Sequence, residues 1–402
     1  MALILERKSE SGEDQQTLTD KHFSQYQETI QRNNTMSDEK SKLTYVITGG
    51  CGFLGQHLLR VLLEKEENIK EIRLFDKNIS QSLQSHSTEH VKVVGIQGDI
   101  TDYRSVHHAF QGADLVFHAA SLVDVWYKVP ENAIYAVNVQ GTENVINACV
   151  EIGIQYLIYT SSMEVVGPNV KGDTFIRGNE DTQYNIFHEM PYPKTKAAAE
   201  KMVLEANGTE VKGGNTLYTC SLRPTGIYGE QHQLMKDFYL NGVRTGGWMI
   251  KGVPRNTEHG RVYAGNVAWM HLLAARALQE HPNRLGGEYY FCYDDSPYKS
   301  YDDFNMQFLS AFNFRSLRLP VCLLWFIAWM NDLIRWLLKP FYNYTPLLNG
   351  YTLAVARTSF TVSTDKAFRH FQYQPLYSWE ECLDRTQGWV NTFPLETSTK
   401  DT

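Results

Sequence analysis

Several features that mark other classes of protein are missing from this 402-residue sequence. Its six cysteines lie far apart and none forms a CxxC pair, so neither a disulfide framework nor a metal site is expected, and a reducing compartment suits the chain. The net charge is -7 and no basic patch with interleaved aromatic residues occurs, so nucleic acid is not an expected partner. Residues 1–42 are polar and lack the apolar run of a signal peptide. What remains is the composition of a globular protein, 43% hydrophobic and 21% charged.

The order of segments along the chain predicts an α/β fold. Short apolar runs rich in β-formers alternate with helically spaced segments; the runs are TYVITGG, EIRLFD, VKVVGIQGDI, ADLVFHAA and QYLIYTSS. This alternation predicts a Rossmann-type, doubly wound parallel sheet with helices on both faces. We expect this core at 43–205, after a disordered N-terminal extension at 1–42. Residues 206–392 are expected to form a smaller C-terminal substrate domain that also returns segments to the core, and 393–402 a tail.

A glycine-rich turn follows the first expected strand. Gly49, Gly52 and Gly55 stand in TGGCGFLG, with Phe53 and Leu54 at the start of the next helix. Glycines at these positions permit a tight turn, a close backbone approach to a pyrophosphate and close helix–strand packing. The helix N-terminus adds free N–H groups and a positive dipole end. An ordinary turn could carry the same glycines, but the strand–turn–helix context favours a dinucleotide site.

Three residues at later strand ends extend this prediction. Asp76 ends the second expected strand 21 residues after Gly55, where a carboxylate can bind both ribose hydroxyls and repel a 2′-phosphate. The cofactor is therefore expected to be NAD rather than NADP. Asp99 ends the third strand, where adenine would lie. Ala119 follows the fourth, where a small residue lets the nicotinamide side of the cofactor pass close to the backbone.

Tyr192 and Lys196 form the candidate catalytic pair. Their i, i+4 spacing in YPKTK puts both on one face of a helix, which Lys194 cannot share. A nearby ammonium, with NAD⁺ beside it, is expected to lower the pKa of the phenol, so that it can take a proton from an alcohol. Ser162, 30 residues before Tyr192, ends the fifth strand and can hold the substrate oxygen. A single pair at this spacing is no rarer than chance, so its position after the glycine turn and the TSS strand carries the prediction.

These segments together resemble a known family. TGGCGFLG, YTSSMEVVGPN, YPKTKAAAE, SLRPTGIYGE, VYAGNVAWMH and PLYSWEE are similar to the 3β-hydroxysteroid dehydrogenase/Δ5–Δ4 isomerases, which are extended short-chain dehydrogenase/reductases. The resemblance runs from about residue 43 to 392 and reaches ordinary surface and core segments. RGNEDT, RTGGWMI and PLLNGYTLAVARTSFTVSTDKA are most similar to the branch that acts on 7α-hydroxylated sterols of bile-acid synthesis.

The resemblance implies a two-step reaction on a sterol. The 3β-hydroxyl is first oxidised to a ketone with NAD⁺ as hydride acceptor, Tyr192 being the base and Lys196 and Ser162 assisting. The ring double bond then moves from Δ5 to Δ4, which requires a base that shifts a proton. The family's acidic residues at the matching positions make Asp294 and Asp295 the isomerase candidates, although a plain acidic turn before Ser296 would look the same. The sequence does not reveal what contacts the 7α-hydroxyl.

The most apolar stretch is 320–338, which nearly reaches the length of a membrane span. Asn331, Asp332 and Arg335 interrupt it, and such groups are costly inside a bilayer. Tryptophans suit the interface, and this stretch has three (Trp325, Trp329, Trp336). We expect a monotopic helix in the endoplasmic reticulum membrane with the catalytic domain facing the cytosol. A buried helix lining the substrate pocket and a spanning helix are the alternatives.

Other functions stay open from the sequence alone. A steroid-hormone enzyme of the same family, or a sugar-nucleotide epimerase or reductase, would use the same core. A catalytically inactive NAD-binding regulator is a third reading, against which the intact Ser162, Tyr192 and Lys196 argue. The sequence leaves the oligomeric state, including a homo-oligomer, undecided.

Overall fold

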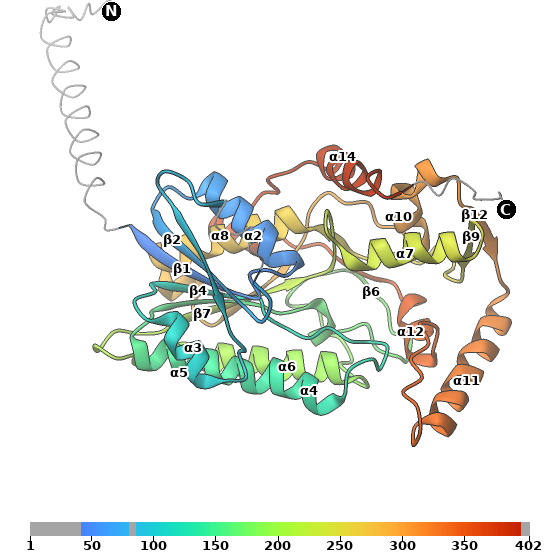
Figure 1. Ribbon diagram of the computed structural model, residues 1–402, viewed down its shortest axis with the longest axis horizontal. Coiled ribbons are helices and arrows are strands. Elements are labelled where there is room, and N and C mark those ends of the chain that lie inside the picture. The colour runs from blue at the N-terminus through green and yellow to red at the C-terminus, as the bar shows by residue number, and fades with distance from the viewer. Residues whose placement is uncertain (1–41, 80–85, 395–402) are drawn as a thin grey trace, which may run out of the picture. The chain divides into compact units, whose positions relative to one another are not determined.

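Seven strands form the central sheet of the protein (Figure 1). The computed structural model describes residues 42–79 and 86–394. The strands are β1 (Leu43–Thr48), β2 (Ile69–Asp76), β3 (Lys92–Gln97), β4 (Leu115–His118), β5 (Tyr156–Thr160), β7 (Tyr218–Pro224) and β11 (Glu288–Cys292). Their order is β11-β7-β5-β4-β1-β2-β3, and every neighbouring pair is parallel. The predicted parallel Rossmann-type sheet is confirmed.

Helices cover both faces of this sheet (Figure 1). One face carries α2 (Phe53–Lys65) and α8 (Ala264–Glu280), and the other carries α3 (Tyr103–Phe110), α5 (Gly141–Ile152) and α6 (Pro191–Glu205). Alternation along β1 divides its side chains between two cores. Tyr45 and Ile47 pack with α2 and α8, while Val46 packs with α3, α5 and α6. Buried apolar residues on both faces are what a parallel sheet requires.

The helical segment after β4 is interrupted by a π turn. It consists of α4 (Glu131–Tyr135), η2 (Ala136–Gln140) and α5, whereas the periodicity predicts one continuous helix. The π turn contains the buried Asn138, whose amide oxygen accepts from Leu122 N at 2.8 Å and whose nitrogen donates to Leu122 O at 3.0 Å. The same nitrogen donates to Thr195 Oγ1 of α6 at 3.0 Å. Single π turns often occur at functional sites, and this one joins the loop after β4 to α6.

The later part of the chain both completes the sheet and builds a smaller region beside its carboxyl edge. Three two-stranded parallel ladders pair β6 (Phe175–Gly178) with β13 (Phe360–Val362), β8 (Gly226–Tyr228) with β10 (Arg261–Tyr263), and β9 (Trp248–Lys251) with β12 (Arg315–Arg318). The remaining helices are η3 (Met163–Val165), α7 (Gln233–Arg244), α9 (Pro282–Leu285), α10 (Tyr301–Phe308), η4 (Ser310–Phe312), α11 (Val321–Leu338), α12 (Gly350–Ala356), α13 (Lys366–Phe371) and α14 (Trp379–Val390). The predicted extension at 1–42 and tail at 393–402 lie almost wholly outside the described residues.

Helix α11 occupies the predicted apolar stretch and is the one helix of the described residues that is long and apolar enough to cross a membrane. It is not a core helix, because only Leu324 and Ala328 along it are buried. Asn331, Asp332 and Arg335 lie at helical spacing from the buried Leu324 and Ala328, so they share the side of α11 that faces the protein. Asn331 donates to Leu348 O at 2.8 Å, Asp332 accepts from Gly350 N at 2.8 Å, and Arg335 stacks 3.5 Å from the ring centroid of Tyr127. Large apolar residues face outward, among them Trp325, Phe326, Trp329, Trp336 and Leu337.

Candidate active site

The glycine turn lies between β1 and α2, as predicted. Gly49 has a φ of +70°, and a Cβ there would lie 2.8 Å from Cα of Ala120. A Cβ on Gly55 would overlap the carbonyl oxygen of Gly49, so only glycine lets α2 pack this closely on the turn. Gly52 is the N-cap residue of α2. Because it has no side chain, it cannot hydrogen-bond the first backbone amides of the helix, which include those of Phe53 and Leu54. Backbone N–H groups at the helix start therefore remain for a phosphate.

Asp76 is joined directly to this turn. One carboxylate oxygen accepts from the backbone N–H of Cys51 at 3.0 Å and the other from that of Asn78 at 3.1 Å. Asp99 follows β3, forms an ion pair with Lys77 at 2.8 Å and accepts from Thr101 N at 2.9 Å. Burial acts to raise the pKa of Asp99, but these contacts lower it on balance.

Ala119 follows β4, and its N–H donates to Thr48 O of β1 at 3.2 Å. The glycine turn, Asp76, Asp99 and Ala119 thus lie at the carboxyl ends of four neighbouring strands. In open α/β sheets, dinucleotides bind in the crevice at this edge, where the strand order reverses between β1 and β4. The residues present fit NAD: a backbone cradle for the pyrophosphate and a carboxylate at the ribose position.

Tyr192 and Lys196 lie one turn apart near the start of α6, and both are buried. The Lys196 ammonium donates to the carbonyl oxygen of Thr160 at 2.6 Å and lies 4.3 Å from the ring centroid of Tyr159. Burial lowers the pKa of Lys196 to about 7, although the charge of Glu200 opposes this. Near neutral pH, this lysine is therefore poised between its charged and neutral forms.

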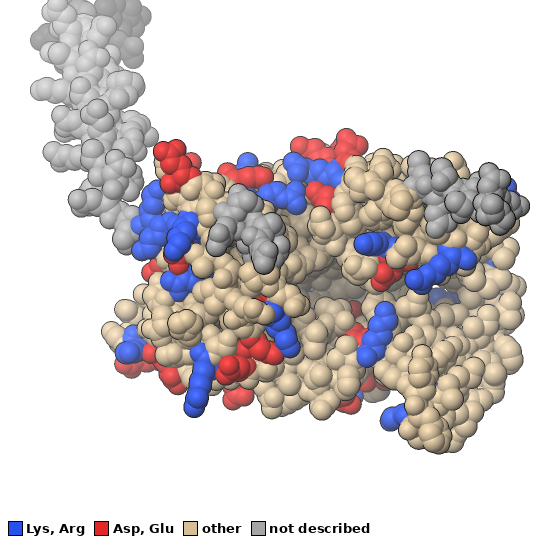
Figure 2. All heavy atoms as spheres, in the orientation of Figure 1, with Lys and Arg blue, Asp and Glu red and all other residues tan. Residues whose placement is uncertain are grey.

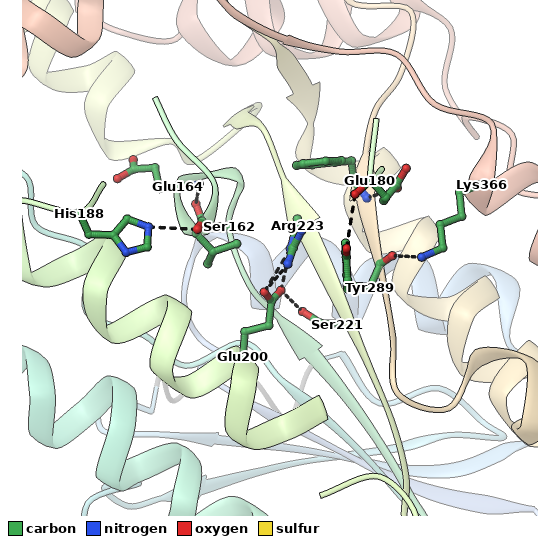
Figure 3. Close-up of polar contacts among 11 residues, drawn as sticks. Ser162, Glu164, Glu180, His188, Glu200, Ser221, Arg223, Tyr289 and Lys366 are labelled. Atoms are coloured by element: carbon green, nitrogen blue, oxygen red, sulfur yellow. Dashed lines mark hydrogen bonds and ion pairs between the residues drawn. The ribbon is translucent and has the colours of Figure 1, made fainter. Parts of the chain in front are cut away.

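Glu200 continues the same helical face one turn beyond Lys196, and the sequence reasoning missed it. Its carboxylate accepts from Ser221 Oγ at 2.7 Å and from Arg223, with Nε at 2.9 Å and Nη2 at 2.7 Å (Figure 3). Both Glu200 and Arg223 are nearly buried, with side-chain exposures of 5% and 12%. This fixed carboxylate counteracts the desolvation of Lys196. The spacing Tyr192–Lys196–Glu200 at i, i+4 and i+8 is the signal that could have found it.

Ser162 follows β5 and caps the short helix η3, where its hydroxyl accepts from Glu164 N at 3.2 Å. Burial raises the pKa of Tyr192 above its usual 10, the charge of Glu164 raises it further, and the Ser162 hydroxyl acts in the opposite direction. The predicted lowering of the Tyr192 pKa is therefore not a property of the chain's own residues, because the phenol is desolvated and faces a carboxyl group. Ser162 and Tyr192 lie together as expected.

Glu164 is a second titratable residue that the sequence reasoning missed. Its Oε2 is buried and has no hydrogen-bond partner among the described residues. Burial raises the pKa of this carboxyl group to about 7. Glu164 thus lies next to Ser162, to which its backbone N–H donates, and its Oε2 has no partner in the described part of the chain. Its position two residues after Ser162 in TSSME could have drawn attention to it, but burial is not readable from that spacing.

Asp294 differs from Glu164 in its contacts and Asp295 differs in its exposure. Asp294 accepts from Tyr263 N at 2.8 Å, Asn266 Nδ2 at 2.9 Å and Ser296 N at 3.0 Å, so both of its oxygens hold the backbone around β10 and α8. Burial raises its pKa, and these hydrogen bonds lower it. Asp295 is exposed. Within residues 42–79 and 86–394, no hydrogen bond joins either carboxyl group to the Tyr192–Lys196–Ser162 set.

Figure 2 shows a hollow near the middle of the drawn face. His118 at the end of β4 is fully buried between Thr48 Oγ1 at 2.7 Å and Thr142 Oγ1 at 3.0 Å. Burial, helped by the charge of Lys196, lowers the pKa of His118 to about 3, so it adds no charge to the site.

Comparison with known proteins decides the family. Residues 46–322 match the 3-beta hydroxysteroid dehydrogenase/isomerase family. The 3 beta-hydroxysteroid dehydrogenase type 7 of Homo sapiens is 56% identical over 358 residues, which cover 88% of this chain and 97% of that protein. The chain belongs to the 3-beta hydroxysteroid dehydrogenase/isomerase family.

Viral members of the family are also similar. The 3 beta-hydroxysteroid dehydrogenase/Delta 5→4-isomerase of vaccinia virus (strain Western Reserve) is 43% identical over 348 residues, covering 86% of this chain and 98% of that one. The family match over residues 46–322 includes the glycine turn and the site on α6.

Solved structures of sugar-nucleotide enzymes share the fold. The dTDP-glucose 4,6-dehydratase of Streptomyces venezuelae, solved with NAD bound, has a TM-score of 0.64 and 18% identity, covering 87% of this chain and 97% of that one. The UDP-glucose 4-epimerase of Thermus thermophilus, in complex with NAD, has a TM-score of 0.61 and 19% identity, covering 88% of this chain and 100% of that one. At these identities, the likeness concerns the architecture and not the substrate.

Proposed function

We propose that this family member oxidises the 3β-hydroxyl of a Δ5 sterol to the 3-ketone, with NAD⁺ as cofactor, and then isomerises the Δ5 double bond to Δ4. The observation that carries the proposal is the set formed by the buried Tyr192 and Lys196 with the half-buried Ser162, at the same edge of the sheet as the glycine turn, in a chain of this family. A 7α-hydroxylated precursor of bile acids is the proposed substrate. The identity to proteins named type 7 supports this branch over the steroid-hormone alternative.

In the oxidation, Ser162 holds the 3β-oxygen and Tyr192 receives its proton. NAD⁺, when bound, supplies the acceptor for the hydride that leaves C3. The desolvated phenol is a weak acid, so its ionised form needs positive charge nearby, which Lys196 contributes in its protonated state. Lys196 is anchored on Thr160 O at the end of β5, which keeps the ammonium fixed with respect to the Ser162 loop.

For the isomerisation, we propose Glu164 as the proton carrier in place of Asp294 and Asp295. The 3-ketone makes the C4 proton acidic; the Glu164 carboxylate removes it and returns a proton at C6, so no redox partner is needed. Tyr192, now protonated, donates a hydrogen bond to the oxygen of the dienolate. The free Oε2 of Glu164 and its pKa of about 7 suit a group that must both accept and release a proton near neutral pH.

We further propose that α11 lies in the cytosolic leaflet of the endoplasmic reticulum membrane. The contacts of Asn331, Asp332 and Arg335 with the protein support a monotopic rather than a spanning helix, because insertion would have to break all three. The outward tryptophans and aliphatic residues form an apolar face of the kind that enters an interface. A water-insoluble sterol would then reach the site from the lipid.

The deciding experiment is turnover of purified protein with NAD⁺ and a 3β-hydroxy-7α-hydroxy-Δ5 sterol. NADH formation reports the oxidation, and the ultraviolet band of the conjugated enone reports the isomerisation. Activity with UDP-sugars and none with any 3β-hydroxysterol would overturn the proposal. Cofactor binding without turnover of either substrate class would favour the inactive regulator.

A further inference from the structure

Three neighbouring polar side chains, Thr225, His259 and Arg261, are buried without hydrogen-bond partners. The unpartnered atoms are Thr225 Oγ1 and Nε and Nη2 of Arg261. The ring nitrogens of His259 form no hydrogen bond of normal geometry, although the backbone carbonyls of Lys299, Val355 and Ala356 lie close enough to raise its pKa. Exposure is 6% for Thr225, 0% for His259 and 8% for Arg261. Arg261 forms no ion pair within the described ranges 42–79 and 86–394. Buried polar groups are nearly always paired, so a cluster of this kind indicates a missing ligand group.

The free atoms of Arg261 have a specific arrangement. Its guanidinium faces are covered by Tyr301, at 4.2 Å from the ring centroid, and by Phe304, at 5.1 Å. Stacking on rings satisfies the faces of a guanidinium but not its in-plane N–H groups. Nε and Nη2 lie on the same edge of the Arg261 guanidinium. This edge therefore presents two parallel N–H donors without acceptors. A Cβ on Gly226 would lie 2.7 Å from Nη1, so glycine at that position leaves room for the guanidinium.

The cluster lies at the same edge of the sheet as the catalytic residues. Thr225 directly follows β7, and Arg261 pairs with Gly226 in the β8–β10 ladder. Strand β7 is the neighbour of β5, which leads into Ser162. Tyr301 packs directly on the cluster: its ring centroid lies 4.2 Å from the Arg261 guanidinium and 3.8 Å from the ring centroid of His259.

The chemistry of the cluster matches a hydroxyl group. Arg261 can only donate hydrogen bonds, whereas an uncharged imidazole and a threonine hydroxyl can also accept them. Burial, with Arg261 next to it, lowers the pKa of His259 to about 3, so the ring is uncharged at neutral pH. A ligand hydroxyl can accept from the guanidinium edge and donate to His259 or Thr225. A carboxylate could accept from the guanidinium edge, the Thr225 hydroxyl and the one imidazole N–H, but only a hydroxyl can also donate to the ring nitrogen of His259 that lacks a proton.

We propose that Thr225, His259 and Arg261 bind the 7α-hydroxyl of the sterol and so determine the choice of an oxygenated substrate. The inference rests on the proposed function, in which Tyr192 acts at C3 and Glu164 at C4 and C6. We place C7 at the cluster because Thr225 directly follows β7, the neighbour of the strand that leads into Ser162. A sterol that bears only the 3β-hydroxyl would leave the buried guanidinium edge unpaired, which disfavours its binding.

The test compares kcat/KM for two 3β-hydroxy-Δ5 sterols that differ only in the 7α-hydroxyl. Arg261→Met should lower kcat/KM about 100-fold for the hydroxylated sterol and less than about threefold for the other, because a site built to bind a hydroxyl discriminates through that contact. Arg255→Met, at an exposed arginine shortly before β10, is the matched control and should leave both values unchanged. Thr225→Val, which keeps the side-chain shape, should cost about 5- to 10-fold, again only for the hydroxylated sterol.

The outcomes separate the inference from the function on which it rests. Turnover of neither sterol by the unmodified protein would overturn the proposed function. If the unmodified protein turns over both sterols, and Arg261→Met and Thr225→Val lower kcat/KM equally for the two, the inference is overturned while the proposed function stands. A third sterol, with a side-chain carboxylate and no 7α-hydroxyl, tests which group the cluster binds. If Arg261→Met lowers kcat/KM for this sterol more than for the 7α-hydroxylated one, the assignment to the 7α-hydroxyl is contradicted. If Arg261→Met fails to fold, as judged by circular dichroism, Thr225→Val decides.

Discussion

Lys196 donates to the carbonyl oxygen of Thr160 at 2.6 Å while Glu200, one turn further along α6, is held by Arg223 at 2.7 Å. Lys196 is thus fixed at the end of β5. The Glu200 carboxylate, itself held by Arg223 and Ser221, favours the charged form of this lysine. Since burial lowers the pKa of Lys196 and Glu200 raises it, the two residues together set the pH range in which the ammonium is present.

Replacing Glu200 with Gln should shift the alkaline limb of kcat/KM to lower pH. Removing the carboxylate lowers the pKa of Lys196 further below its value of about 7, so the charged form is lost earlier as pH rises. A pH profile measures the shift. The control is Glu205→Gln, because Glu205 forms an exposed pair with Lys201. An unmoved limb in a folded Glu200→Gln protein would show that Lys196 does not control it.

Replacing Tyr192 with Phe should lower kcat for sterol oxidation by about 10²- to 10⁴-fold, the usual contribution of a general base. NADH binding, followed by fluorescence, should stay unchanged because the glycine turn and Asp76 are untouched. Tyr135→Phe, at a tyrosine that is 49% exposed, should behave like the unmodified protein. Retention of more than about a tenth of kcat would remove Tyr192 from the base role.

Replacing Glu164 with Gln should separate the two reactions. Oxidation continues, since loss of the carboxylate removes an effect that raises the pKa of Tyr192. Isomerisation should fall by about 10²- to 10⁴-fold, so NADH forms while the non-conjugated 3-ketone accumulates. Asp295→Asn is the comparison, and loss of isomerisation there, with Glu164→Gln active, would assign the step to Asp295.

The same Glu164→Gln substitution should have a pH-dependent effect on stability. The folded protein holds the Glu164 proton up to about pH 7, whereas an unfolded chain loses it near the ordinary value of 4.5. The folded state therefore binds more protons between these values, and its stability falls as pH rises through them. Above pH 7, the variant should be more stable than the unmodified protein by up to about 3 kcal/mol, and below pH 4.5 the difference should vanish. Denaturant unfolding at several pH values measures this, and a constant difference would contradict it.

Charges on the outward face of α11 should release the protein from lipid. Phe326→Glu combined with Trp336→Glu should lower the fraction that sediments with phosphatidylcholine vesicles by about tenfold, because these residues are 57% and 70% exposed. Phe368→Glu, at a residue of α13 that is 41% exposed, controls for general surface charge. If the double variant sediments like the control, α11 is not the membrane contact.

The sequence predicts the sheet and the cofactor edge well because both depend on local patterns. The run TYVITGG forms β1, and the glycines that follow it form the turn for steric reasons that involve Ala120 and the turn itself. Tyr192 and Lys196 likewise lie one turn apart in α6, as their i, i+4 spacing predicts.

The remaining features depend on packing between distant segments. Glu164 is significant because other segments bury it, and Asp294 because three partners from 263–296 occupy its oxygens. The π turn at Asn138 comes from contacts with Leu122 and Thr195, which helical periodicity does not record. That Lys196 and NAD⁺ together lower the pKa of Tyr192 stays a prediction. In the chain itself burial raises this pKa, and burial cannot be read from the motif.

The amide of Asn138 has a consequence for motion during turnover. By binding Leu122 and Thr195 at once, it couples the loop beside the nicotinamide position to the helix that carries the proton acceptor. A shift of the 119–122 loop on substrate entry would therefore be transmitted to the start of α6 through this single side chain.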